Sequence, residues 1–154
     1  MTGGLVTTEA GEARWWADGL AVIKLTAENS GGALSIVEVT EPPNAAAPLH
    51  VHHAEDETFY ILEGEVTFEL GGGRCTAAPG DVVFGPRGVP HRYDVGGTGA
   101  RMLFVTTPGG FEAVVRAMSV PATEPRLPGR VHEPADADAA QAAARAHQVE
   151  VLDA

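Results

Sequence analysis

Three histidines and one glutamate in this sequence stand at spacings that could place them around a single metal ion. His50 and His52 are two residues apart in a segment that alternates like a β-strand, so both imidazoles should project from the same face. Glu57 follows after a short turn, at the head of the next such segment, and His91 comes much later, after a turn rich in Gly and Pro. Strands that converge would bring these side chains into a mixed nitrogen and oxygen site.

That set of ligands favours a transition metal. Imidazole and carboxylate groups suit Ni, Fe, Mn, Co or Zn, with Cu also open, better than Ca or Mg. Four protein ligands leave positions on the ion for water, substrate or dioxygen, which is typical of a catalytic site. We therefore predict one divalent transition metal ion, held by His50, His52, Glu57 and His91. A buried His pair that only forms hydrogen bonds is the competing interpretation. It ranks lower because each of the four ligand positions carries a residue that can bind a metal.

Other polar and aromatic residues are not expected to bind the metal. His53 should point outward by strand parity, and Glu55 and Asp56 are expected in a solvated turn. Trp15 and Trp16 could cover a pocket, but packing in the core or at an interface is the preferred interpretation.

The elements that must position the ligands are expected to be short strands. Nineteen glycines and eleven prolines are spread along the chain as turns between alternating segments, the pattern of an all-β sandwich or barrel. We expect about eight to ten strands, with a tight hairpin at residues 63–65. The expected strands are residues 20–26, 33–39, 48–52, 57–63, 65–70, 74–78, 82–84, 91–95 and 100–106.

The pattern changes after Pro108. A short helix is predicted by one apolar stripe at helical spacing, made of Phe111, Val114, Val115 and Met118. Residues 134–147 are rich in alanine and predict a second helix, and the proline-containing stretch between the two predicts an irregular strap. We expect a single domain over 1–154, with a barrel core at about 20–107 and a helical C-terminal extension at about 108–154.

Two segments that contain the four ligands resemble the paired motifs of the cupin family. They are His50-x-His52-x4-Glu57-x6-Gly64 and Gly80-x5-Pro86-x-Gly88-x2-His91. The family's usual opening glycine of the first motif falls at Asn44 here, and the closing asparagine of the second falls at Val95. Neither position is a ligand, so the site survives both departures. The resemblance implies an all-β cupin jelly-roll barrel with short C-terminal helices.

Residues of about 20–154 are also similar to the quercetin dioxygenase-like monocupins of actinobacteria. The resemblance rests on the segments around residues 26–60 and on the passage at 107–112 into a helix. It implies a metal-dependent dioxygenase for a flavonol-like or other enolisable aromatic or polyketide molecule, with Glu57 as the general base. A metal-dependent polyketide cyclase or isomerase is the second interpretation, and a non-catalytic small-molecule binding protein is the third.

Strand parity also predicts the wall of the pocket. Phe59 and Ile61 should share the inward face of Glu57, and Tyr93 should share that of His91. The last strand should direct inward either Met102 with Phe104, the pair named here for the pocket, or Leu103 with Val105. Arg92 should point outward, so no cation is expected beside the ligands unless the second option brings in Arg101. A neutral, flat, oxygen-bearing ring compound is therefore the expected substrate.

Composition limits the other partners. Lys and Arg total 10 against 21 Asp and Glu, and a net charge of −11 disfavours nucleic acid and anionic membrane surfaces. The start of the sequence lacks the charged and apolar regions of a signal peptide, and no apolar run is long enough to cross a membrane. The single cysteine, Cys75, cannot form an internal disulfide, which favours a cytoplasmic protein. A homodimer is the assembly that the family resemblance implies.

Overall fold

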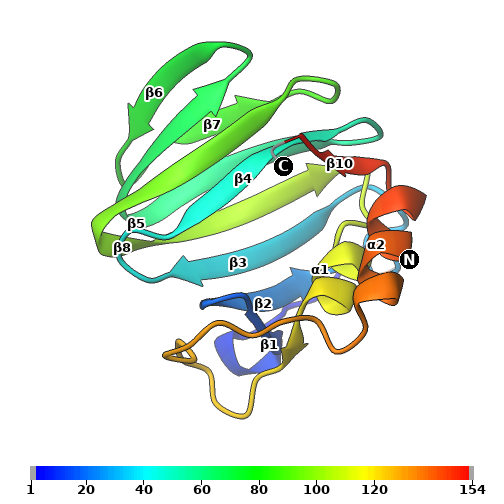
Figure 1. Cartoon of the computed structure of the whole chain (residues 1–154). Coiled ribbons are helices and arrows are strands. Elements are labelled where there is room, and N and C mark those ends of the chain that lie inside the picture. Colours follow the sequence, from blue (N-terminus) through cyan, green and yellow to red (C-terminus); the bar gives the residue numbers. More distant parts are fainter. Residues whose placement is uncertain (1–2, 153–154) are drawn as a thin grey trace.

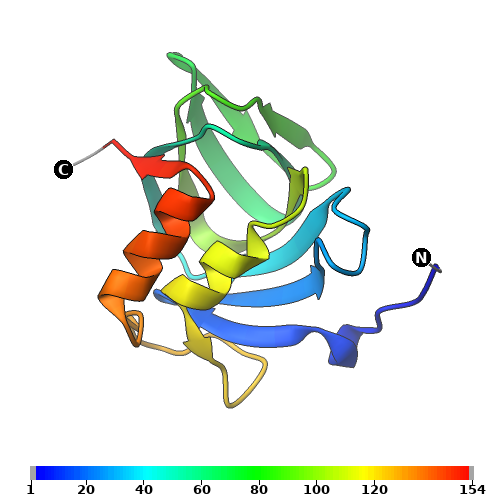
Figure 2. The same cartoon turned by 90° about the vertical axis from the view of Figure 1, so that its right-hand side faces the viewer.

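The computed structural model describes residues 3–152, about half of which lie in strands that curl around a common interior (Figures 1 and 2). The strands are β1 Glu12–Trp16, β2 Gly19–Leu25, β3 Ser35–Glu41, β4 Ala46–His52, β5 Asp56–Leu70, β6 Gly73–Ala77, β7 Val82–Gly85, β8 His91–Thr107, β9 Val120–Pro121 and β10 Val149–Val151. The helices are the short 3₁₀ helix η1 Thr8–Ala10 and the α-helices α1 Glu112–Met118 and α2 Ala137–Ala146. The prediction of an all-β jelly roll with short C-terminal helices is confirmed.

The two longest strands organise the sheet. β5 and β8 pair in antiparallel register from Asp56 opposite Thr107 to Leu70 opposite His91. Neighbouring strands of the sheet follow the order β10-β4-β8-β3-β2-β1-β9. In addition to β8, β5 pairs with β6 and β7. The pairing of β4 with β8 sets His50 directly opposite His91, so residues 41 positions apart in the sequence become neighbours.

The predicted hairpin at residues 63–65 is wrong, because β5 continues through it as one bent strand. Gly64 has a φ of +80°, a conformation that favours glycine. A Cβ atom there would lie 2.0 Å from the carbonyl oxygen of Gly99 on β8, so the missing side chain allows the two strands to approach closely. The glycine therefore marks an irregularity within the β5–β8 pair rather than a reversal of the chain.

The inward face of the last long strand is now defined. Met102 and Phe104 are 0% and 4% exposed, whereas Leu103 and Val105 are half-buried on the opposite face. The first of the two predicted options is thus confirmed. Inward residues of β2, β3, β5 and β8 form one core cluster, and aromatic rings of Phe59, Phe68 and Phe104 pack at its centre.

The predicted helices lie together at one side of the strands (Figure 1). Helix α1 buries Val114 and Val115 of its apolar stripe against the core. Helix α2 begins at Ala137, three residues later than its predicted start, because the Asp136 side chain accepts a hydrogen bond from the Ala139 amide and caps it. After α2 the chain turns and adds β10 to β4 in antiparallel register. Within the described part of the chain, no helix is both long and apolar enough to cross a membrane.

Residues 122–134 form the predicted strap, since they contain no helix and touch the sheet through the Ala122 amide, which bonds to the carbonyl of Ala13, and through an isolated bridge of His132 to Ala17. Trp15 holds the strap in place. Its indole Nε1 donates a hydrogen bond of 2.8 Å to the carbonyl oxygen of Arg126, and its ring stacks on His132 at a centroid distance of 4.9 Å. Trp15 therefore packs beneath the strap.

Candidate metal centre

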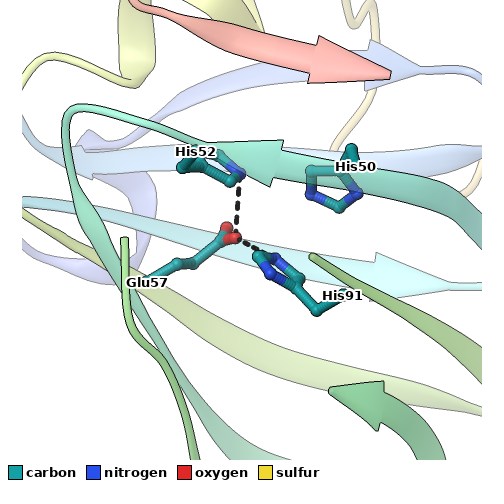
Figure 3. Close-up of side chains that lie close together, drawn as sticks. All are labelled: His50, His52, Glu57 and His91. Atoms are coloured by element: carbon teal, nitrogen blue, oxygen red, sulfur yellow. Dashed lines mark hydrogen bonds and ion pairs between the residues drawn. The ribbon is translucent and has the colours of Figure 1, made fainter. Parts of the chain in front are cut away.

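Three strands bring the predicted ligands to one point inside the barrel (Figure 3). His50 and His52 lie on β4, Glu57 is the second residue of β5, and His91 is the first residue of β8. One ligand atom from each of the four lies within 4.8 Å of those of the other three. His52, Glu57 and His91 are buried and His50 is half-buried, so the cluster is most accessible to solvent at His50.

Each imidazole is oriented by a partner on its Nδ1 atom. His50 Nδ1 lies 2.7 Å from the carbonyl oxygen of Pro48, and His91 Nδ1 lies 3.1 Å from that of Val89. Carbonyl oxygens only accept hydrogen bonds, so both rings carry their proton on Nδ1 and leave the Nε2 lone pair for a cation. His52 Nδ1 lies 2.9 Å from Glu55 Oε1, which orients this third ring.

The atoms that face the interior of the cluster, the Nε2 atoms and a Glu57 oxygen, converge as a metal site requires. Glu57 Oε2 lies 3.1 Å from His52 Nε2 and 3.0 Å from His91 Nε2. Ligands about 2.1 Å from an ion and at right angles to one another would be about 3 Å apart. His52 Nε2 is also buried without a hydrogen-bond partner in the described structure. A cation between these atoms would satisfy it, so the residues fit a mixed nitrogen and oxygen transition-metal site.

The charges of the cluster are strongly coupled. Burial would lower the pKa of His52, but the Glu57 and Glu55 carboxylates outweigh it and raise that pKa to about 9. Burial would raise the pKa of Glu57, yet the positive charge of His52, whose Nε2 lies 3.1 Å from Glu57 Oε2, holds it far below its usual value. Burial lowers the pKa of His50. Without metal, the centre is therefore a carboxylate stabilised chiefly by a protonated His52.

Metal binding should accordingly release a proton. An ion must displace the proton of His52, whose raised pKa keeps it protonated in the metal-free protein at neutral pH. The affinity should rise about tenfold per pH unit from about pH 7 to about pH 9 and level off above it. Titration calorimetry in buffers of different ionisation enthalpy should give about one proton released per ion at pH 7. An affinity that is flat over this interval would contradict the assignment.

Glu55 is a functional residue that sequence reasoning missed. The prediction of a solvated turn is wrong for this side chain, which is 3% exposed and accepts the His52 Nδ1 contact. Asp56 next to it is half-buried at the protein surface and pairs with the Arg87 guanidinium at 3.1 Å. The spacing of three residues between His52 and Glu55 is the signal that could have found the pair.

Replacing Glu55 by alanine should weaken metal binding by about 10- to 100-fold, because His52 would lose the acceptor that orients its ring. The matched control is Glu150→Ala. Glu150 accepts a contact of 2.9 Å from His53, a histidine that is exposed and points away from the centre as predicted. Competition with a chromophoric chelator would measure both affinities. Equal losses in the two variants would mean that Glu55 has no special effect on the site.

The centre adjoins a cavity of about 280 Å³ that is lined mainly by apolar side chains. Of the pocket residues expected from parity, Phe59, Tyr93 and Phe104 line it. Ile61 and Met102 are fully buried in the core and do not reach its wall. The sequence analysis missed a group contributed from outside the barrel strands, since Phe111 and Val114 of α1 and residues of α2 and β10 also line the cavity.

No Lys or Arg lines this cavity within residues 3–152. Arg92 forms an ion pair with Glu69 at 2.9 Å, and Arg101 pairs with Glu38 and Glu63 at 3.0 Å each. The prediction that no Lys or Arg side chain lies beside the ligands is confirmed for the described residues. Asp18 and Glu41 line the cavity instead, so its charged groups away from the centre are acidic.

Fold and site together define a small β-barrel protein with a metal-binding motif, and comparison with known sequences gives its family. Residues 37–107 match the cupin domain, and the chain is a small cupin that resembles quercetinase-like proteins. It is 31% identical over 104 residues to quercetin 2,3-dioxygenase of Bacillus subtilis, an alignment that covers 68% of this chain and 31% of that protein. The chain thus spans about a third of that relative's length.

Solved structures support the same fold. KdgF from a Halomonas species superposes with a TM-score of 0.65 at 19% identity, over 72% of this chain and 98% of that one. The polyketide cyclase RemF from Streptomyces resistomycificus superposes with a TM-score of 0.58 at 24% identity, over 69% of this chain and 80% of that one. At these identities the similarity establishes the cupin fold.

Proposed function

We propose that this cupin is a metal-dependent dioxygenase that acts on a flavonol-like or other enolisable aromatic or polyketide molecule. The observation that carries the proposal is a centre of three histidines and one glutamate that opens on an apolar cavity without lysine or arginine among the described residues. The 31% identity to a quercetin 2,3-dioxygenase supports the choice of substrate class.

The chain's own residues would divide the work as follows. A divalent transition metal bound to His50, His52, Glu57 and His91 would supply a Lewis acid for adjacent enol and keto oxygens. The carboxylate of Glu57, which is ionised at neutral pH, would take the enol proton. The rings of Phe59 and Phe104 would hold a flat substrate and keep water from it.

The charge of the cavity narrows the substrate further. An anionic substrate would face Asp18 and Glu41 without a compensating cation in the described part of the wall. A neutral molecule meets no such penalty. We therefore propose a small, neutral, aromatic partner.

An oxygen electrode tests the proposal directly. The purified protein would be analysed for metals, stripped, and reloaded separately with Ni, Fe, Mn, Co, Zn and Cu, and each form mixed with a panel of flavonols. We expect dioxygen consumption and loss of the flavonol absorption band with at least one metal, and neither in the stripped protein. Turnover that continues at the same rate without dioxygen would overturn the assignment.

That last result would instead support a metal-dependent polyketide cyclase or isomerase, the second candidate. It is favoured by the apolar cavity, which would fit a polyketide equally well, and by the cupin fold that this chain shares with the cyclase RemF. Tight ligand binding with no product under either condition would point to a binding protein.

A further inference from the structure

The cavity has a second polar end, formed by two carboxyl groups that the proposed chemistry does not use. Glu41 is the last residue of β3, and Asp18 lies in the turn between β1 and β2. Tyr93 joins this end to the metal centre, because its hydroxyl donates a hydrogen bond of 2.7 Å to Glu41 Oε1. Glu41 is thus a fixed carboxyl on the cavity wall.

Glu41 and the metal ligands lie at different places along the cavity. Tyr93 follows His91 by two residues on β8 and shares its inward face, a separation on the order of 7 Å along the strand. Its hydroxyl then extends to Glu41. The wall near these groups is aromatic, with Trp16, Phe59 and Phe104. The cavity therefore offers a polar group at each of two places with an apolar surface between them.

One oxygen of Glu41 is left without a partner. Oε1 accepts the Tyr93 bond, whereas Oε2 accepts no hydrogen bond from the residues that the structure describes. Oε2 lies against Gly19, where a Cβ atom would come within 2.8 Å of it, so the glycine makes room for the carboxyl. No lysine or arginine lines the wall beside it in residues 3–152. A carboxyl held in a cavity without a cation or a second donor is a candidate for ligand recognition.

The acidity of Glu41 agrees with this placement. Burial raises its pKa to about 7, against the lowering effect of the Tyr93 hydrogen bond and with a smaller contribution from Asp18. A hydroxyl donor from a ligand would compensate for the lost hydration of the carboxyl.

We propose that Glu41 Oε2 accepts a hydrogen bond from a hydroxyl group at the end of the substrate remote from its metal-binding oxygens. This inference rests on the proposed function, in which the enol and keto oxygens face the metal centre. It makes Glu41 a specificity-determining residue, and it narrows the substrate class to neutral polyphenols that carry a hydroxyl on the ring opposite the enol.

Two flavonols provide matched probes. Kaempferol and galangin share the enol and keto oxygens, and kaempferol has one additional hydroxyl on the remote ring. Dissociation constants would be measured with the metal-loaded protein by fluorescence titration. We expect wild-type protein to bind kaempferol at least about tenfold more tightly than galangin, since the additional hydroxyl meets the Glu41 carboxyl as an acceptor.

Glu41→Leu should abolish this preference and leave galangin binding within about twofold. Glu41→Gln, which keeps a polar side chain of the same size, should reduce the preference and serves if the leucine variant does not fold. Glu38→Gln is the control, because Glu38 lies on the same strand but pairs with Arg101 outside the cavity. It should keep the wild-type preference.

Equal binding of the two flavonols by wild-type protein, or an unchanged preference in both Glu41 variants, would overturn the inference and leave the proposed dioxygenase intact. Failure of both flavonols to bind the metal-loaded wild-type protein would overturn this inference together with the flavonol-like substrate of the proposed function.

Discussion

Replacing His91 by alanine should leave the protein almost free of metal. His91 contributes a buried Nε2 atom that converges with His52 on Glu57, and no other described side chain could take its place in the cluster. A metal site of four protein ligands is worth about 10–16 kcal/mol, so one lost ligand should cost on the order of 100- to 1,000-fold in affinity. Elemental analysis should fall from about one ion per chain to a small fraction, and the proposed oxygen consumption should fall with it.

His53→Ala is the control for that experiment. His53 is adjacent to ligand His52, but its side chain is 46% exposed and its Nε2 lies 2.9 Å from Glu150. This variant should retain the wild-type metal content. Circular dichroism should show the same β-rich spectrum for both variants. Full metal occupancy in a folded His91→Ala protein would refute the four-ligand centre.

Glu57→Gln should lower turnover by about 100- to 10,000-fold, the range expected when a general base is removed. The amide keeps the size of the side chain and one oxygen, but it cannot take a proton at neutral pH. The same change removes the largest charge that raises the pKa of His52, so His52 should lose its proton at lower pH than in the wild type. Rates must be measured per bound ion under excess metal, so that weaker binding is not mistaken for slower chemistry.

The matched control for Glu57 is Glu65→Gln, on the same strand but exposed to solvent. It should leave both metal content and turnover unchanged. Undiminished turnover per ion in Glu57→Gln would show that the proton leaves the substrate by another route.

The ligand cluster could be predicted because its determinants are local. Parity directs His50 and His52 to one face of β4, and a turn that contains Gly88 directly precedes β8 and His91. The departure at Asn44 is also explained locally. Asn44 has a φ of 63°, a left-handed conformation that asparagine tolerates better than most residues, so it can replace the glycine expected there.

The remaining parts of the site depend on contacts that no local pattern contains. Glu41, on β3, reaches the cavity through the pairing of β3 with β8. The same holds for β10 and α2, whose contribution to the cavity wall depends on the path of the strap. At Gly64 the sequence correctly indicates a glycine in a left-handed conformation. It does not distinguish a turn from a bulge, because such a glycine occurs in both.

The single-domain organisation over 1–154, the homodimer and the cytoplasmic location also stay predictions. Light scattering of the metal-loaded protein would decide the second.

The pairing of β10 with β4 has a consequence for solubility. β4 carries two of the ligands, and on the side away from β8 its backbone pairs with Val149–Val151. Without that short segment, the amides and carbonyls of β4 would form a bare sheet edge, a ready template for another chain. β10 therefore guards against aggregation at the strand that carries two of the candidate metal ligands.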